Sequence, residues 1–107
     1  MIDRKGEVEK MDFKKLINSH QEEIVKSVQE SVRIKSVEEK PMPNKPFGEG
    51  PYKALEHALN LAKELGFETK NLEGYAGYVE FGEGEETVGI LAHLDVVPEG
   101  EGWTYPP

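Results

Sequence analysis

The chain has 107 residues, with 13 basic and 21 acidic side chains and a formal net charge of −8 at pH 7. This length suits one small domain and is too short for two. The acidic balance argues against nucleic acid or an anionic membrane surface as a partner, because both require a basic face. The chain has no cysteine. It therefore lacks disulfides and thiolate ligands, and any metal must be held by His, Asp, Glu or water.

The N-terminal residues are polar and show no apolar periodicity. Residues 1–11 are expected to form a leader, which leaves residues 12–107 as the domain. No segment is apolar enough to span a bilayer, and the N-terminus lacks the apolar core of a secretory signal. We therefore expect a cytoplasmic protein that has no membrane partner.

Residues 13–32 are predicted to form one long amphipathic helix. Asp12 is a suitable N-cap residue, and apolar side chains recur after it at helical spacing. His20 falls on the same stripe, where a packed histidine at the edge of a core is expected more often than a metal ligand. The stripe predicts that this helix lies on an apolar surface. Its members are Phe13, Leu16, Ile17, Ile24, Val28 and Val32.

The next residues predict a connector, a loop and a second helix. Residues 33–37 read as a short extended connector, and the prolines and glycines of residues 38–50 preclude a regular element. Loops of that length in compact domains are usually functional or mobile. The second helix is predicted over residues 51–65, with a proline in its first turn and Gly66 as a left-handed C-cap. His57 lies off its apolar stripe, so we expect this histidine in solvent.

After the second helix the pattern changes to that of strands. Residues 67–71 are a candidate short strand, and residues 75–81, aromatic and β-branched, are a stronger one. A glycine-rich turn at residues 82–86 is expected to join the latter to a strand at residues 87–92. That last strand is nearly continuous in apolar residues, as in strands covered on both faces. The sequence thus predicts an α/β fold of two helices plus a β-hairpin and a buried strand, in an incomplete sheet.

A candidate site follows the expected buried strand. His93 comes directly after it, and sites in open α/β sheets gather at the carboxyl ends of strands. If the backbone stays extended, the side chains of His93 and Asp95 point to the same side. A carboxylate can accept a ring N–H of a metal-bound histidine and fix its tautomer. The triplet alone is a weak signal, because zinc needs three or four protein ligands, and neither His20 nor His57 has a partner at a recognisable spacing.

The stretch around His93 resembles the first metal-ligand motif of the M20 family of zinc peptidases, in particular its Xaa-His dipeptidase (PepV-type) branch. The similarity extends over most of the chain. The segments that carry it are Arg33–Val37, Pro46–Pro51 with the helix through Phe67, Gly74–Tyr78, Gly89–Pro98 and Gly102–Pro107.

This resemblance implies the N-terminal part of a metallopeptidase catalytic domain that hydrolyses dipeptides through a metal-activated water. His93 would be a ligand of one zinc ion in a two-metal site, with Co²⁺ or Mn²⁺ as possible replacements. Asp95 would be the catalytic carboxylate that orients His93. The other ligands, a glutamate general base and a smaller second domain would belong to a C-terminal remainder beyond Pro107, so this chain alone is expected to be inactive.

Two other interpretations stay open. The first is another M20 amidohydrolase activity, such as an aminoacylase, carboxypeptidase or desuccinylase, because residues outside this stretch largely set specificity. The second is a non-catalytic interaction module, in which an exposed sheet edge invites a partner strand. Tyr52, Trp103 and Tyr105 could line a substrate cleft, although packing is the usual role of such aromatic residues. The isolated chain is expected to be marginally stable.

Overall fold

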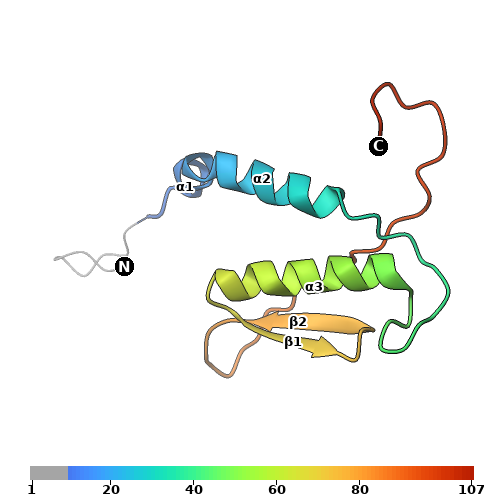
Figure 1. Ribbon diagram of the computed structural model, residues 1–107. Coiled ribbons are helices and arrows are strands. Elements are labelled where there is room, and N and C mark those ends of the chain that lie inside the picture. The colour runs from blue at the N-terminus through green and yellow to red at the C-terminus, as the bar shows by residue number, and fades with distance from the viewer. Residues whose placement is uncertain (1–9) are drawn as a thin grey trace, which may run out of the picture. The chain divides into compact units, whose positions relative to one another are not determined.

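The computed structural model describes residues 10–107 (Figure 1). Most of the expected leader, residues 1–11, therefore lies outside the described residues. The fold is mixed α/β, as the sequence predicts at that level. The chain divides into two compact units, the first ending at Glu30 and the second beginning at Ser31, and each is described by itself. The elements are α1 Phe13–Ser19, α2 Gln21–Val32, α3 Glu49–Glu64, β1 Glu68–Leu72 and β2 Ala76–Glu80.

The first unit begins with the predicted helix cap. The side chain of Asp12 accepts a hydrogen bond from the main-chain N–H of Lys15 at 3.1 Å, which satisfies one of the free donors at the start of α1. No residue of α1 or α2 is buried. The predicted packing of their apolar stripe on another surface is therefore not found among residues 10–107.

The single long helix predicted over residues 13–32 is divided at His20. Its main-chain N–H bonds to the carbonyl of Ile17 at 3.0 Å, three residues back, so the i→i−4 ladder is interrupted. The residues at the break, Asn18, Ser19 and His20, are consecutive weak helix formers. The helical spacing of apolar residues therefore continues across these three positions, although their side chains add little stability to a helix.

In the second unit, α3 begins at Glu49, two residues before the predicted start, and Pro51 lies in its first turn. Its end confirms the predicted cap. Gly66 has φ +91°, its N–H donates to the carbonyl of Lys63, and the N–H of Phe67 donates to Ala62, both at 3.0 Å. This pair of bonds is the Schellman arrangement, which requires a left-handed residue after the helix.

The β-hairpin is formed by β1 and β2, which pair antiparallel from Glu68 opposite Glu80 to Leu72 opposite Ala76. The predicted pairing of residues 75–81 with residues 87–92 is wrong. The chain reverses earlier, through Glu73 and Gly74, which both have positive φ values of 56° and 80°. Two consecutive left-handed residues match the twist of a tight hairpin, and this turn brings adjacent strands together before the glycine-rich segment is reached.

The core lies between α3 and one face of this hairpin (Figure 1). Leu55 and Leu59 are each 8 % exposed and lie on the buried side of the helix. A Cβ atom added at Gly77 of β2 would lie 2.9 Å from one methyl of Leu59 and 3.0 Å from a methyl of Leu55. The missing side chain at Gly77 thus allows the two layers to approach closely.

Residues 87–92 do not form the predicted buried strand. They have no regular secondary structure, and Ile90 and Leu91 are 93 % and 100 % exposed. An apolar strand is buried on both faces only when layers cover both, and no element of residues 10–107 covers these side chains. Among residues 10–107, no helix has the length and apolar character needed to cross a membrane.

The proline-rich loop before α3 is folded rather than open. The N–H of Lys45 donates to the carbonyl of Met42 at 2.9 Å and closes a tight turn, in which Asn44 has φ +61°. The ring of Phe47 packs edge-on against Tyr75, with centroids 5.7 Å apart. The loop therefore rests on the hairpin turn and fixes the chain that enters α3.

Candidate metal-binding pair

His93 and Asp95 are brought together by a short local loop. The ring nitrogen Nδ1 of His93 lies 3.0 Å from the main-chain oxygen of Asp95 and 3.3 Å from its carboxylate oxygen Oδ1. A carbonyl oxygen can only accept, so Nδ1 carries the proton and donates. In the neutral ring, Nε2 then keeps its lone pair, and it has no hydrogen-bond partner among the described residues.

This geometry agrees in part with the expected arrangement. The two residues share one side, and the acidic residue holds the proton on Nδ1. The nearer acceptor, however, is the main-chain carbonyl of Asp95 rather than its carboxylate. The side chains are 82 % and 65 % exposed, and His93 lies in a segment without regular secondary structure instead of at the end of a buried strand. The roles of metal ligand and orienting carboxylate remain predictions.

The loop that carries this pair is attached to the segment before α3. The main-chain N–H of Val96 donates to the carbonyl of Ser36 at 3.2 Å, and Val37 and Val96 form a parallel bridge. Ser36 is 5 % exposed, so the attachment point is buried. The sequence alone does not predict this contact, because two valines 59 positions apart carry no signal that they pair.

The ligand atoms that His93 and Asp95 offer fit part of a zinc site. Imidazole nitrogen and carboxylate oxygen are both common zinc ligands, and His93 offers a free Nε2. The pair supplies at most two ligands. Residues 10–107 contain no group of three or more His, Cys, Asp or Glu side chains that could hold a metal ion. A complete site therefore requires donors from outside this described stretch.

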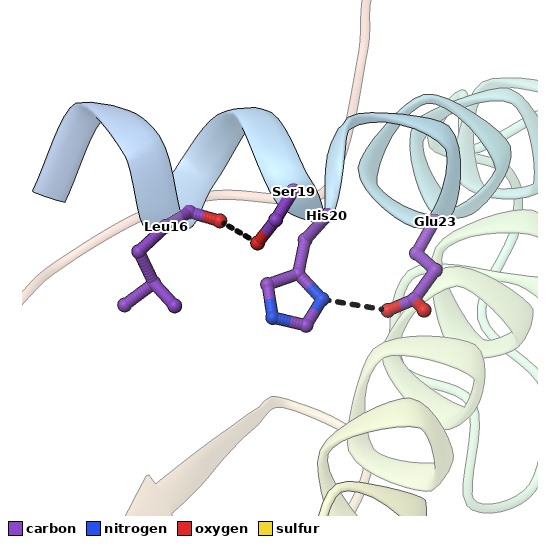
Figure 2. A network of polar contacts seen from close by, with 4 residues as sticks. All are labelled: Leu16, Ser19, His20 and Glu23. Carbon is purple, nitrogen blue, oxygen red and sulfur yellow. Dashed lines mark hydrogen bonds and ion pairs between the residues drawn. The ribbon is translucent and has the colours of Figure 1, made fainter.

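His20 belongs to a separate polar network at the junction of α1 and α2 (Figure 2). Its Nδ1 lies 3.1 Å from the carboxylate of Glu23, and the hydroxyl of Ser19 donates to the carbonyl of Leu16 at 2.6 Å. The expectation of a packed histidine is wrong, because the ring is exposed. The apolar members of the same stripe are exposed as well, so the ring has no core to pack against and interacts with the carboxylate of Glu23 instead.

His57 is not in solvent, contrary to the prediction. The residue is half-buried, and its Nε2 is buried without a hydrogen-bond partner among the described residues. Positions 50, 54 and 57 follow one another at spacings of four and three, so they share one side of α3. Gly50 and the buried Ala54 on that side show that the helix is covered beyond its leucine stripe.

Two of the three aromatic candidates, Trp103 and Tyr105, do not pack in a core. Trp103 donates from its ring N–H to the carbonyl of Glu99 at 2.8 Å, and both Trp103 and Tyr105 are exposed. They line an open hollow of about 570 Å³ formed by residues 99 and 101–107. Tyr52 belongs to the first turn of α3 and is half-buried, with Lys45 Nζ 5.1 Å from its ring centroid. The expectation that packing is the role of Trp103 and Tyr105 is therefore wrong for this structure.

A small charged cluster lies at the start of α3. The ammonium of Lys45 donates to Glu49, and Lys53 Nζ lies 3.6 Å from the other oxygen of the same carboxylate. The hydrogen bond from Lys45 lowers the pKa of Glu49, the two positive charges act in the same direction, and desolvation opposes them. The carboxylate thus stays ionised at the positive end of the helix dipole.

Comparison with known proteins points to one class. The chain matches no protein-family model, but it is similar to proteins that are named as dipeptidases. It is 48 % identical over 88 residues to "Putative dipeptidase YtjP" of Bacillus subtilis. The aligned region covers 80 % of this chain and 19 % of that protein. It is 42 % identical over 99 residues to "Beta-Ala-Xaa dipeptidase" of Lactobacillus delbrueckii subsp. lactis, which covers 91 % and 21 %.

A further relative from Staphylococcus epidermidis, with a name of the same kind, is 36 % identical over 93 residues. The chain spans about a fifth of the length of the curated relatives it matches. The similarity therefore connects this chain with one segment of dipeptidases.

Proposed function

We propose that this chain is part of a metal-dependent dipeptidase of the M20 type, with zinc as the metal and His93 as one of its ligands. The observation that carries the proposal is the His93–Asp95 pair, in which Nδ1 donates to Asp95 and Nε2 is left free. The similarity to proteins named as dipeptidases supports the reaction class. The remaining metal ligands and the general base are proposed to lie outside residues 10–107.

In this proposal each residue of the pair has one task. The main-chain carbonyl and carboxylate of Asp95 keep the proton on Nδ1 and hold the ring in one orientation. The lone pair of Nε2 is then free to bind a metal ion. A carboxylate near the ring also raises the basicity of the imidazole. When bound, zinc supplies Lewis acidity toward a water molecule and toward the peptide carbonyl of the substrate.

The comparisons favour this function over the alternatives. None of the cited relatives is named as an aminoacylase, carboxypeptidase or desuccinylase. The interaction-module interpretation relied on an exposed sheet edge, and a two-stranded hairpin leaves such edges in any protein. The interaction module does not explain why an imidazole is held with one nitrogen toward an acidic residue and the other free, whereas the other M20 activities would use the same pair and are disfavoured by the names of the relatives alone.

The proposal can be tested in a chimera. This chain replaces the matching fifth of the Lactobacillus relative, and hydrolysis of dipeptides with N-terminal β-alanine is measured with added Zn²⁺. We expect activity that a chelator removes and that Zn²⁺, Co²⁺ or Mn²⁺ restores. His93→Ala should lower kcat/KM by more than the roughly 10- to 100-fold that loss of a group hydrogen-bonded to a metal ligand costs. The loss of kcat/KM in Asp95→Asn should fall within that roughly 10- to 100-fold range.

The matched control is His20→Ala, because His20 is also an exposed histidine with an acidic neighbour. This variant should keep the full rate. Metal content is measured by elemental analysis on the same samples. A His93→Ala chimera that retains its rate and its bound zinc would refute the proposed role of His93.

A further inference from the structure

The first turn of α3 touches the backbone of the segment before the proline-rich loop. A Cβ atom added at Gly50 would overlap the main-chain oxygen of Lys35 and lie 3.3 Å from Cα of Ser36. Gly50 does not have a positive φ, so the backbone conformation does not require glycine here. The requirement is space, because the helix and the segment are in direct backbone contact.

The same segment holds the loop that carries His93. The carbonyl of Ser36 accepts the N–H of Val96 at 3.2 Å, and Val96 directly follows Asp95. Ser36 is buried, whereas Val96, His93 and Asp95 are all exposed. The bond to Ser36 and the Val37–Val96 bridge thus link this exposed loop to a buried part of the second unit.

We propose that Gly50 is a positioning residue for the His93–Asp95 pair. By leaving room for the backbone of Lys35 and Ser36 against α3, it sets where Val96 and the two preceding functional residues lie. The inference rests on the proposed function, since the pair has a task only if His93 binds metal. A side chain at Gly50 pushes the segment away from the helix, and the loop moves with it. Displacements of about 1 Å at a reacting group can cost roughly 100-fold in rate.

The position of the loop can be measured without any activity. The chain has no cysteine, so Asn60→Cys, at an exposed site on α3, accepts a single spin label. Paramagnetic broadening of the His93 and Asp95 amide signals then reports their distance from the helix. We expect Gly50→Ala to change this broadening and to speed hydrogen exchange of the Val96 amide by at least about tenfold, since its acceptor is displaced.

Gly89→Ala is the matched control, because a Cβ atom there meets nothing within 4 Å and φ is not positive. This control should leave both signals unchanged. A second variant covers the case in which Gly50→Ala does not fold. Val96→Pro removes the donor to Ser36 without touching α3 and should change the broadening, whereas Val97→Pro keeps the donor and should change it less. If neither Gly50→Ala nor Val96→Pro moves the His93 signal, the inference is overturned.

The chimera separates this inference from the proposed function. Gly50→Ala should lower kcat about 100-fold with a much smaller change in KM, while Gly89→Ala stays within about twofold. A chimera whose activity does not depend on His93 contradicts the proposed function, and the spin-label result still decides where the loop lies. A Gly50→Ala chimera with unchanged kcat and unchanged broadening contradicts the positioning role alone.

Discussion

Gly77 sets how closely α3 and the hairpin approach each other. A methyl group at this position would be within 3.0 Å of three leucine methyls, one from Leu55 and two from Leu59. Contacts that short do not persist in proteins, so the leucines would have to move. Both are among the few buried apolar residues of residues 10–107, and a core that small has little room to adjust.

We therefore expect Gly77→Ala to destabilise the chain by about 1–3 kcal/mol, the usual cost of overpacking. The measurement is the midpoint of urea unfolding followed by far-ultraviolet circular dichroism. Gly89→Ala adds the same methyl group in open space and should change the midpoint little. Equal midpoints for the two variants would show that the layers are not in contact as described.

Glu49 gives a second prediction for a single residue, because its pKa is lowered chiefly by the hydrogen bond from Lys45. A carboxyl whose pKa falls on folding adds stability above its ordinary pKa, 4.5 for this group, and that stability is lost as the pH falls through the folded pKa. Lys45→Gln should raise the pKa of Glu49 toward its ordinary value. The contribution of Glu49 to the free energy of unfolding, which is lost in acid, should then be smaller.

The titration of the Glu49 carboxyl carbon by NMR measures this shift directly. Lys40→Gln removes the same charge from an exposed residue of the preceding loop and should leave the titration nearly unchanged. An identical midpoint in wild type and Lys45→Gln would mean that the ion pair does not persist in solution, as happens for many surface pairs.

Among the elements, the hairpin is joined to α3 by one side chain with two tasks. Asn71 of β1 donates from Nδ2 to the carboxylate of Glu56 at 2.8 Å. Its Oδ1 accepts the N–H of Gly74 in the turn, also at 2.8 Å. The amide is suited to this position because it offers a donor toward the helix and an acceptor toward the turn. The turn and the helix contact are thus coupled through one residue.

Asn71→Asp should separate the two tasks. The carboxylate keeps the acceptor for Gly74 but places a negative charge beside Glu56. We expect a loss of about 1–2 kcal/mol at pH 7 from the lost bond and the repulsion, measured as a lower urea midpoint. Adding Glu56→Gln should restore most of it, and Glu56→Gln alone is the control. If Asn71→Asp lowers the urea midpoint equally with and without Glu56→Gln, Asn71 and Glu56 are not in contact.

At the scale of the whole molecule, many apolar side chains are in solvent. Among residues 10–107, the most exposed large apolar side chains are those of Val88, Ile90 and Leu91, which follow β2. Short apolar β-branched segments that are free of charge and exposed tend to pair with other chains. This exposed stretch therefore gives a physical reason to expect that the chain associates with itself.

We expect the chain to self-associate as its concentration rises, and Ile90→Lys with Leu91→Lys to suppress this. Analytical ultracentrifugation over a range of concentrations is the measurement. Because these side chains are exposed, the free energy of unfolding measured in urea should change by less than about 0.5 kcal/mol. Thr87→Lys adds a charge at an exposed polar position of the same segment and should have a weaker effect. A monomeric wild type at all concentrations would contradict the prediction.

Local signals in the sequence were sufficient for features that depend on neighbouring residues. Asp12 as a cap, Pro51 in a first turn and Gly66 after the helix each follow from the backbone chemistry of a few positions. The adjacency of His93 and Asp95 is of the same kind, because two residues at alternate positions of an extended chain share a side. The metal that they are proposed to bind is not determined by that adjacency.

Features that depend on distant residues were decided by the tertiary structure alone. Three such features are the pairing of β2 with β1, the main-chain bond from Val96 to Ser36 and the buried Nε2 of His57. No local pattern connects the residues involved. The apolar residues 87–92 predicted a buried strand, but burial needs layers on both faces, and hydrophobic sequence cannot supply them. The sequence by itself determined where helices are capped and which residues stand side by side, whereas packing determined which surfaces meet.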